Sequence, residues 1–161
     1  THDNCQQGKT WQWQGLTFTV LWPVNIVGEE NDESCVVQVF DGKHTVLLPG
    51  DISKKVENIL IKSNLLTKVD VLVAAHHGSK TSSSANFVRH TSPQVVVFSS
   101  GYLNRWKMPV SSVVDRFKEN GADIYNTATD GMTQINFNDN KVSVNTYQQE
   151  LQPFWPYKLK Y

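Results

Sequence analysis

The order of apolar and polar residues along the chain predicts strands in several places. Residues 12–23 (QWQGLTFTVLWP) alternate between apolar and polar side chains and are rich in β-forming types, which is typical of a strand, or of a hairpin that turns at Gln14-Gly15. Residues 69–75 and 94–99 are short, mostly apolar runs that suit buried strands. Asp41-Gly42 is a turn signal between two further strands. The predicted strands are 12–23, 35–40, 44–48, 69–75, 94–99, 124–125, 132–137 and 142–144.

Apolar residues at helical spacing predict three helices between these strands. In the first helix they recur at positions i, i+4, i+7 and i+8, which places them on one face. The third helix is expected to begin at Pro109, since proline suits a first helical turn, and to stop at Asn120-Gly121. The apolar residues of the three helices are Ile52, Val56, Ile59 and Leu60, then Phe87 and Val88, then Val110, Val113, Val114 and Phe117.

Strands and helices alternate in the middle of the chain, and hairpins flank them on both sides. This order predicts a layered α/β fold with a mixed sheet. The sequence contains no repeat, linker or low-complexity stretch, so it is expected to form one domain or part of one. The tail 148–161 carries Phe154, Trp155 and Tyr157 and is expected to dock on that domain.

Charge and composition narrow the classes of function. The 161 residues include 15 Lys+Arg and 15 Asp+Glu, so the formal net charge is zero. This balance argues against a protein that binds nucleic acid mainly by electrostatic attraction, but it allows a local nucleic-acid site. No apolar run approaches the roughly 18 residues that a membrane span needs. The sequence begins with Thr1 and no signal-peptide pattern follows, so a segment of a longer protein is expected.

Three loops that follow predicted strands carry residues suited to chemistry, and functional groups of α/β sheets gather at strand ends. Asp51 follows the first of these strands; taken alone, it suits the N-cap of the next helix. His76 and His77 follow an apolar strand, where paired imidazoles suit a metal ion as well as a structural role. The third loop, 99–106, contains Gly, Asn and Arg, which are also ordinary loop residues.

Two familiar catalytic motifs are absent from the sequence. Gly78-Ser79-Lys80-Thr81 is similar to part of a phosphate-binding P-loop, but the pattern G-x-x-x-x-G-K-[ST] is not met because Ser79 separates the glycine from the lysine. This loop can still offer backbone N–H groups and one positive charge to a phosphate. The G-x-S-x-G motif of serine hydrolases does not occur.

Taken together, the three loops resemble a known family. The resemblance is carried by 50–52 (GDI), by 70–79 (DVLVAAHHGS), and by the pattern Ser-Gly-x-x-Asn followed by proline at 100–109. With the upstream segments 5–18 and 31–37 (NDESCVV), these residues are similar to the metallo-β-lactamase-like domain of the ComEC family, the inner-membrane channels that bring DNA into competent bacteria. The resemblance covers almost the whole chain, and an aspartate followed at this distance by HHGS is fairly specific.

The resemblance implies a two-metal hydrolase site in a mixed-sheet αββα sandwich. Asp51 would bridge two divalent ions, zinc or manganese, and His76 would be the histidine ligand, with His77 as the second choice. The implied reaction is the cleavage of phosphodiester bonds in incoming DNA, in which metal ions stabilise the charge that develops on phosphate oxygens. The residues that would position the DNA backbone are Ser79, Lys80 and Asn104.

The sequence departs from the family pattern in two places. The H-x-H-x-D-H motif that supplies most metal ligands of this fold is absent, so residues 1–161 are expected to be the C-terminal part of a single metallo-β-lactamase-like domain. This fragment alone is then expected to be inactive and to lack a complete metal pair. Met108 replaces the histidine that usually precedes Pro109, and a thioether cannot relay a proton. The alternative is a non-catalytic module that guides DNA or braces the channel.

The resemblance also implies partners and a location. The partners would be single-stranded DNA, the rest of the channel protein and other competence proteins, and the domain would face the periplasm from the bacterial inner membrane. Cys5 and Cys35 lack the spacing of a zinc site, so the residues alone leave free thiols and a single disulfide as alternatives. In an oxidising periplasm a Cys5–Cys35 disulfide would persist.

Overall fold

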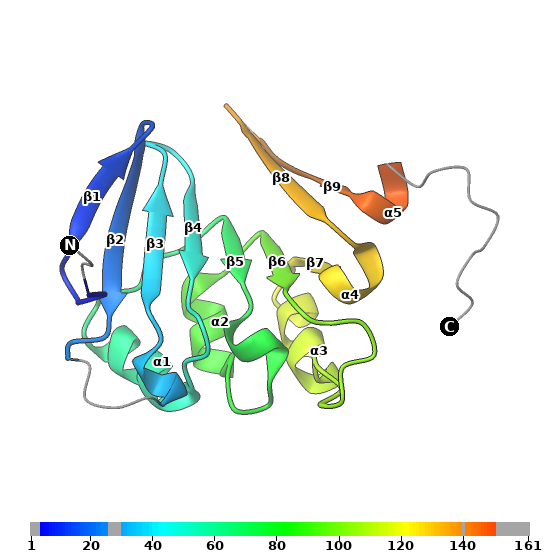
Figure 1. Ribbon diagram of the computed structural model, residues 1–161, viewed down its shortest axis with the longest axis horizontal. Coiled ribbons are helices and arrows are strands. Elements are labelled where there is room, and N and C mark those ends of the chain that lie inside the picture. Colours follow the sequence, from blue (N-terminus) through cyan, green and yellow to red (C-terminus); the bar gives the residue numbers. More distant parts are fainter. Residues whose placement is uncertain (1–3, 26–29, 140, 151–161) are drawn as a thin grey trace.

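The structure is a computed structural model that describes residues 4–25, 30–139 and 141–150. Its main sheet has seven strands in chain order: β1 (Thr10–Trp13), β2 (Leu16–Trp22), β3 (Val36–Phe40), β4 (Thr45–Leu48), β5 (Val71–Val73), β6 (Val95–Phe98) and β7 (Asp123–Asn126). Strands β1 to β4 pair antiparallel, and β4 to β7 pair parallel (Figure 1). The sheet is therefore mixed, as the sequence predicts.

Three helices connect the parallel strands and cover one face of the sheet: α1 (Lys54–Lys62), α2 (Ala85–Thr91) and α3 (Ser111–Glu119) (Figure 1). Their apolar stripes are buried in one core cluster with Leu47, Leu72 and Phe98 of the sheet. Phe98 meets Phe117 of α3 edge to face, with 5.9 Å between the ring centroids. Among the described residues, no helix combines the length and apolar character that a membrane crossing requires.

A separate hairpin packs on the opposite face of the parallel half of the sheet. It consists of β8 (Thr133–Asn138) and β9 (Lys141–Thr146) (Figure 1). Val71, Val95 and Val97 form a second core cluster with apolar residues of this hairpin, such as Phe137 and Val144. Helices, main sheet and hairpin therefore form three successive layers.

The antiparallel half of that same face carries a further row of apolar side chains. Trp11 pairs with Phe18, Phe18 with Val39, and Val39 with Val46, so strand register puts the four on one face. The rings of Trp11 and Phe18 are stacked, with centroids 5.1 Å apart. Trp11 and Trp13 remain 46% and 60% exposed. The part of this face around Trp11 and Trp13 is therefore apolar and open.

A disulfide joins Cys5, which precedes β1, to Cys35, which precedes β3. The two Cα atoms are 5.9 Å apart, within the range that a disulfide spans. The bond closes a loop with a sequence separation of 30 residues and ties the N-terminal segment to the sheet.

The hairpin alternative for residues 12–23 is confirmed, because β1 and β2 pair antiparallel with Gln14 and Gly15 in left-handed conformation at the turn. Other details differ from the sequence-based predictions. The third helix begins at Ser111 rather than Pro109, because Val110 is its N-cap. The aromatic residues 154–157 of the tail lie outside the described residues. Periodicity misses elements of about one turn: η1 (Asn31–Glu33), η2 (Ala75–Gly78), α4 (Thr127–Asp130) and α5 (Tyr147–Glu150).

Candidate functional site

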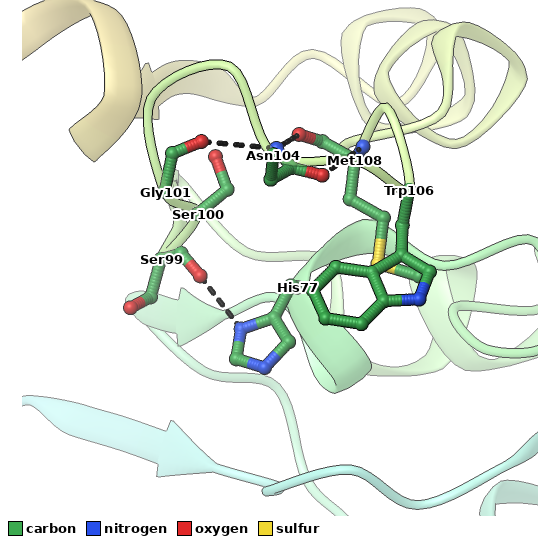
Figure 2. A pocket seen from close by; sticks show the side chains of 7 residues that line it. All are labelled: His77, Ser99, Ser100, Gly101, Asn104, Trp106 and Met108. Carbon is green, nitrogen blue, oxygen red and sulfur yellow. Dashed lines mark hydrogen bonds between the residues drawn. The ribbon is translucent and has the colours of Figure 1, made fainter.

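The three loops that the sequence singles out meet at one edge of the sheet. They follow β4, β5 and β6, and parallel pairing places the carboxyl ends of these strands at the same edge. Asp51 of the first loop lies beside His77 of the second. Six residues between Ser99 and Met108, from the third loop and its continuation, line a pocket together with His77 (Figure 2).

Asp51 is not the N-cap of α1, so the simplest interpretation of this residue from sequence is wrong. The cap is Ser53, whose hydroxyl accepts a hydrogen bond from the backbone N–H of Lys55. Asp51 lies two residues earlier, where its backbone N–H donates to the Ser34 hydroxyl at 3.0 Å. Its carboxylate has no capping role and faces the His77 ring, with 38% of the Asp51 side chain exposed.

The turn that carries the two histidines has an unusual backbone. His76 and His77 have φ angles of 50° and 55°, and Gly78 follows with 83°. A left-handed backbone raises the conformational energy of a residue other than glycine by about 1–2 kcal/mol, and here two such residues are adjacent. The His76 N–H donates to the Gly50 carbonyl at 3.0 Å, and the Gly78 carbonyl accepts from the Val110 N–H at 3.0 Å. Both neighbouring loops thus hold the turn, and such backbone strain clusters at functional sites.

The His77 ring is oriented by one hydrogen bond. Its Nδ1 lies 2.6 Å from the Ser99 carbonyl oxygen, which can only accept, so Nδ1 carries the proton and donates (Figure 2). In the neutral ring this leaves the lone pair on Nε2, the nitrogen that lies 3.8 Å from Asp51 Oδ1. A backbone carbonyl on the far ring nitrogen is the usual outer partner of a metal-binding histidine.

His76 has different surroundings. Its Nε2 lies 3.5 Å from the Asn31 side-chain nitrogen, and the two histidine rings are 6.3 Å apart at nearly a right angle. The family resemblance ranks His76 ahead of His77, whereas the structure places the His77 ring beside Asp51. Sequence spacing does not distinguish these neighbours, because their left-handed backbone determines where each ring points.

Asn104 closes the third loop upon itself. Its side-chain nitrogen donates to the carbonyls of Gly101 at 3.0 Å and Met108 at 2.7 Å, and its oxygen accepts from the Met108 N–H at 2.9 Å (Figure 2). Asn104 therefore shapes the loop with both amide N–H groups already paired, rather than directing them at a substrate. The pocket beneath has a volume of about 190 Å³ and is lined by His77, Ser99, Ser100, Gly101, Asn104, Trp106 and Met108. Of these, Trp106 belongs to none of the sequence motifs that predict the site.

Ser79 and Lys80 differ in their access to a ligand. Ser79 is only 5% exposed, and its hydroxyl is hydrogen-bonded to the Thr81 hydroxyl at 3.0 Å. Lys80 is exposed, and its carbonyl accepts a hydrogen bond from the Lys54 ammonium at 2.6 Å. The structure therefore leaves Lys80 as the accessible positive charge of this loop and gives Ser79 a structural position.

The donor atoms at the edge fit part of a metal site. An aspartate oxygen and an oriented imidazole nitrogen suit zinc or manganese. Within the described ranges, however, no group of three or more His, Cys, Asp or Glu side chains gathers closely enough to hold a metal ion. Asp51 and His77 could supply two ligands, which is fewer than a complete metal centre needs.

Similarity to known proteins covers nearly the whole chain. No family model matches it. The chain is 40% identical over 152 residues to Recombination protein 2 of Haemophilus influenzae and 33% identical over 156 residues to the uncharacterised protein YcaI of Escherichia coli. It is 39% identical over 131 residues to competence protein ComA of Neisseria gonorrhoeae. The chain is homologous to one segment of these proteins.

That segment is a small part of each relative. The matches cover 94%, 96% and 78% of this chain but only 19%, 21% and 18% of the three relatives. The chain therefore spans about a fifth of the length of the curated relatives that it matches.

A solved structure supports the fold class. The chain superposes with a TM-score of 0.52 on a Parabacteroides distasonis protein named as a candidate metal-dependent hydrolase, covering 76% of this chain and 56% of that one at 15% identity. At this identity the likeness concerns the fold alone. The predicted mixed-sheet α/β fold is confirmed by the seven-stranded mixed sheet and by its likeness to this neighbour.

Proposed function

We propose that this chain is part of a metal-dependent, nuclease-type phosphodiesterase domain in a protein of bacterial DNA uptake. The observation that carries the proposal is the Asp51–His77 pair, 3.8 Å apart at the carboxyl edge of the sheet, with the His77 proton held on Nδ1 by the Ser99 carbonyl. Divalent ions at such a site stabilise the negative charge of a phosphate undergoing hydrolysis. The similarity to a protein named for competence favours DNA as the substrate.

The proposed metal ligands in this chain are Asp51 and His77, with zinc or manganese as the ion. His77 is preferred to His76 because its Nε2 lies beside the Asp51 carboxylate and its Nδ1–H is already bonded. Lys80, exposed on the next turn, is the residue of this loop best placed to attract a phosphate. Ser79 and Asn104 support these groups by fixing the backbone of their loops.

The remaining ligands are proposed to come from another part of the same protein. Two ligands cannot hold a metal pair, so residues 1–161 alone are expected to be inactive. The open apolar face around Trp11 and Trp13 supports this, because in an αββα sandwich a second sheet would cover it. The chain is then the C-terminal part of one such sandwich.

A second function is favoured by Met108. This side chain lines the pocket beside His77, where the family pattern has a histidine, and its thioether can neither accept nor deliver a proton in a reaction (Figure 2). A module that holds DNA or braces a membrane channel without cutting would need no acid at this position. This non-catalytic role is the alternative.

Location and partners are part of the same proposal. We place the domain on the periplasmic side of the inner membrane, attached to the rest of the channel protein and near other competence proteins. The Cys5–Cys35 disulfide supports an oxidising compartment, since cytosolic thiols are kept reduced.

The test is a cleavage assay on the chain extended to include the rest of its domain. Labelled single- and double-stranded DNA are incubated with Mn²⁺ or Zn²⁺, and Asp51→Asn is compared with the wild type. Asp51→Asn should lower cleavage by roughly 100-fold or more, because losing even an outer partner of a metal ligand costs about 10- to 100-fold. Asp115→Asn, on the exposed side of α3, is the matched control. DNA binding without cleavage by the folded wild type would favour the non-catalytic module.

A further inference from the structure

The loop between β6 and α3 exposes large apolar side chains beside the candidate site. Leu103 is 82% exposed, Trp106 62% and Tyr102 51%, all within five consecutive residues. Large apolar groups concentrated on one exposed loop, rather than scattered singly, indicate an interaction site.

The loop is also positively charged. Residues 101–108 (GYLNRWKM) contain Arg105 and Lys107, both exposed, and no acidic residue, whereas the whole chain is neutral. The Arg105 guanidinium carbon lies 4.3 Å from the centre of the Trp106 ring, in cation–π contact. Aromatic faces interleaved with positive charges suit a ligand that has both flat rings and negative groups.

The loop is held in this shape by its own hydrogen bonds. Asn104 bonds to Gly101 and Met108 across it, and the Lys107 N–H donates to the Asn104 carbonyl at 3.0 Å. Leu103 and Lys107 both have positive φ angles, of 50° and 53°, which these bonds stabilise. Pre-ordered aromatic groups bind without the entropic cost of fixing a flexible loop.

Trp106 belongs to the same pocket as His77 (Figure 2). A nucleic-acid strand with a phosphate at Asp51 and His77 would therefore bring a neighbouring base to the indole. Unpaired bases stack on aromatic side chains, whereas the bases of a duplex are already stacked on each other. We propose that residues 101–108 form a stacking platform for single-stranded nucleic acid, with Trp106 as its main contact and Arg105 and Lys107 at the phosphates. This inference rests on the proposed function for its substrate class.

The test measures binding and not cleavage, so that the two proposals fail separately. A fluorescein-labelled 12-residue oligothymidine is titrated with the 161-residue chain in EDTA and followed by fluorescence anisotropy. Trp106→Ala should weaken binding about tenfold or more, since one stacked base contributes about 1–3 kcal/mol. Trp106→Phe should retain most of the affinity, because the phenyl ring still offers a face on which a base can stack.

Trp13→Ala is the matched control, because Trp13 is 60% exposed on β1 and belongs to the open sheet face. It should leave oligothymidine binding unchanged, and Trp106→Ala should leave the weaker binding of a 12-base-pair duplex unchanged. The proposal is overturned if the wild type does not bind oligothymidine, or if Trp13→Ala weakens binding as much as Trp106→Ala. It is also overturned if the chain binds phosphatidylglycerol vesicles but not the oligonucleotide, and if Trp106→Ala weakens that vesicle binding. If oligothymidine binds as predicted but the complete domain does not cleave DNA, the proposed function is contradicted and the stacking platform is still supported.

Discussion

His77 lies beside Asp51 because its backbone adopts a conformation that few residues other than glycine take. The left-handed pair His76-His77 turns the chain sharply after β5, and the hydrogen bond from His77 Nδ1 to the Ser99 carbonyl fixes the ring. Neither feature follows from residue types alone. At the scale of the residue, this turn and the ring hydrogen bond determine which histidine ring lies beside Asp51.

A second turn gives a prediction for acid stability. The Asp41 carboxylate accepts hydrogen bonds from the His44 backbone N–H at 2.6 Å, from the His44 ring at 3.0 Å and from the Lys43 N–H at 2.8 Å. These bonds, led by the His44 backbone N–H, lower the pKa of Asp41 from 3.8 to about 2. A lowered pKa in the folded state stabilises the protein above the unfolded value, and the gain is lost as the pH falls from 3.8 to about 2.

Asp41→Asn should therefore reduce the free energy of unfolding at pH 7 and flatten the loss of stability between pH 3.8 and about 2. Urea unfolding followed by circular dichroism across this range measures both effects. Asp115→Asn, on the exposed side of α3, should stay within about 0.5 kcal/mol of the wild type at pH 7. An Asp41→Asn protein with the wild-type pH profile would show that these hydrogen bonds do not stabilise the fold.

At the scale of the element, the segment between the histidine turn and α2 is held by two helices. Glu57 of α1 is fully buried, and its two carboxylate oxygens accept the backbone N–H groups of Ser83 and Ser84. Burial raises the pKa of Glu57, and the two N–H donors oppose that rise. Arg116 of α3 donates to the Ser83 carbonyl. The segment is therefore fixed by side chains from α1 and α3.

Glu57→Ala should lower the free energy of unfolding by about 2–6 kcal/mol, because two backbone donors would lose their acceptor and each unpaired buried group costs about 1–3 kcal/mol. Glu119→Ala, at the exposed end of α3, is the control and should cost no more than about 0.5 kcal/mol. Chemical denaturation of both variants gives the comparison. Equal stability of the two would mean that water satisfies the N–H groups of the segment when Glu57 is removed.

The elements themselves could largely be predicted from sequence, and their fine structure could not. The spacing of apolar residues predicts the buried faces of α1 and α3, because burial of residues such as Leu60 and Phe117 stabilises these helices. Asp51 and Ser53 are both good capping residues, so only the start of α1 decides between them. Asn104 resembles a ligand in sequence, yet its amide closes its own loop. The helix cap and the role of Asn104 depend on the three-dimensional course of the backbone, which sequence patterns do not predict.

At the scale of the whole molecule, the Cys5–Cys35 disulfide fastens the N-terminal strands to the sheet. A bond that closes a loop of this length, 30 residues, restricts the unfolded chain and stabilises the fold by about 3–4 kcal/mol in the chain-entropy model. The double variant Cys5→Ser, Cys35→Ser should lose about that much stability in urea unfolding. Adding a reductant should destabilise the wild type and leave the variant unaffected. Two free thiols in a mass measurement without reductant would contradict the prediction.

Zinc binding to the domain extended by its remaining part tests most directly whether Asp51 and His77 form one corner of a metal centre. Isothermal titration calorimetry would compare the wild type with Asp51→Asn, His77→Ala and His76→Ala, each checked for folding by circular dichroism. Asp51→Asn and His77→Ala should weaken zinc binding at least about 10- to 100-fold, because each removes a ligand. His76→Ala should bind zinc with nearly the wild-type affinity. Loss of binding in His76→Ala with retention in His77→Ala would contradict the assignment.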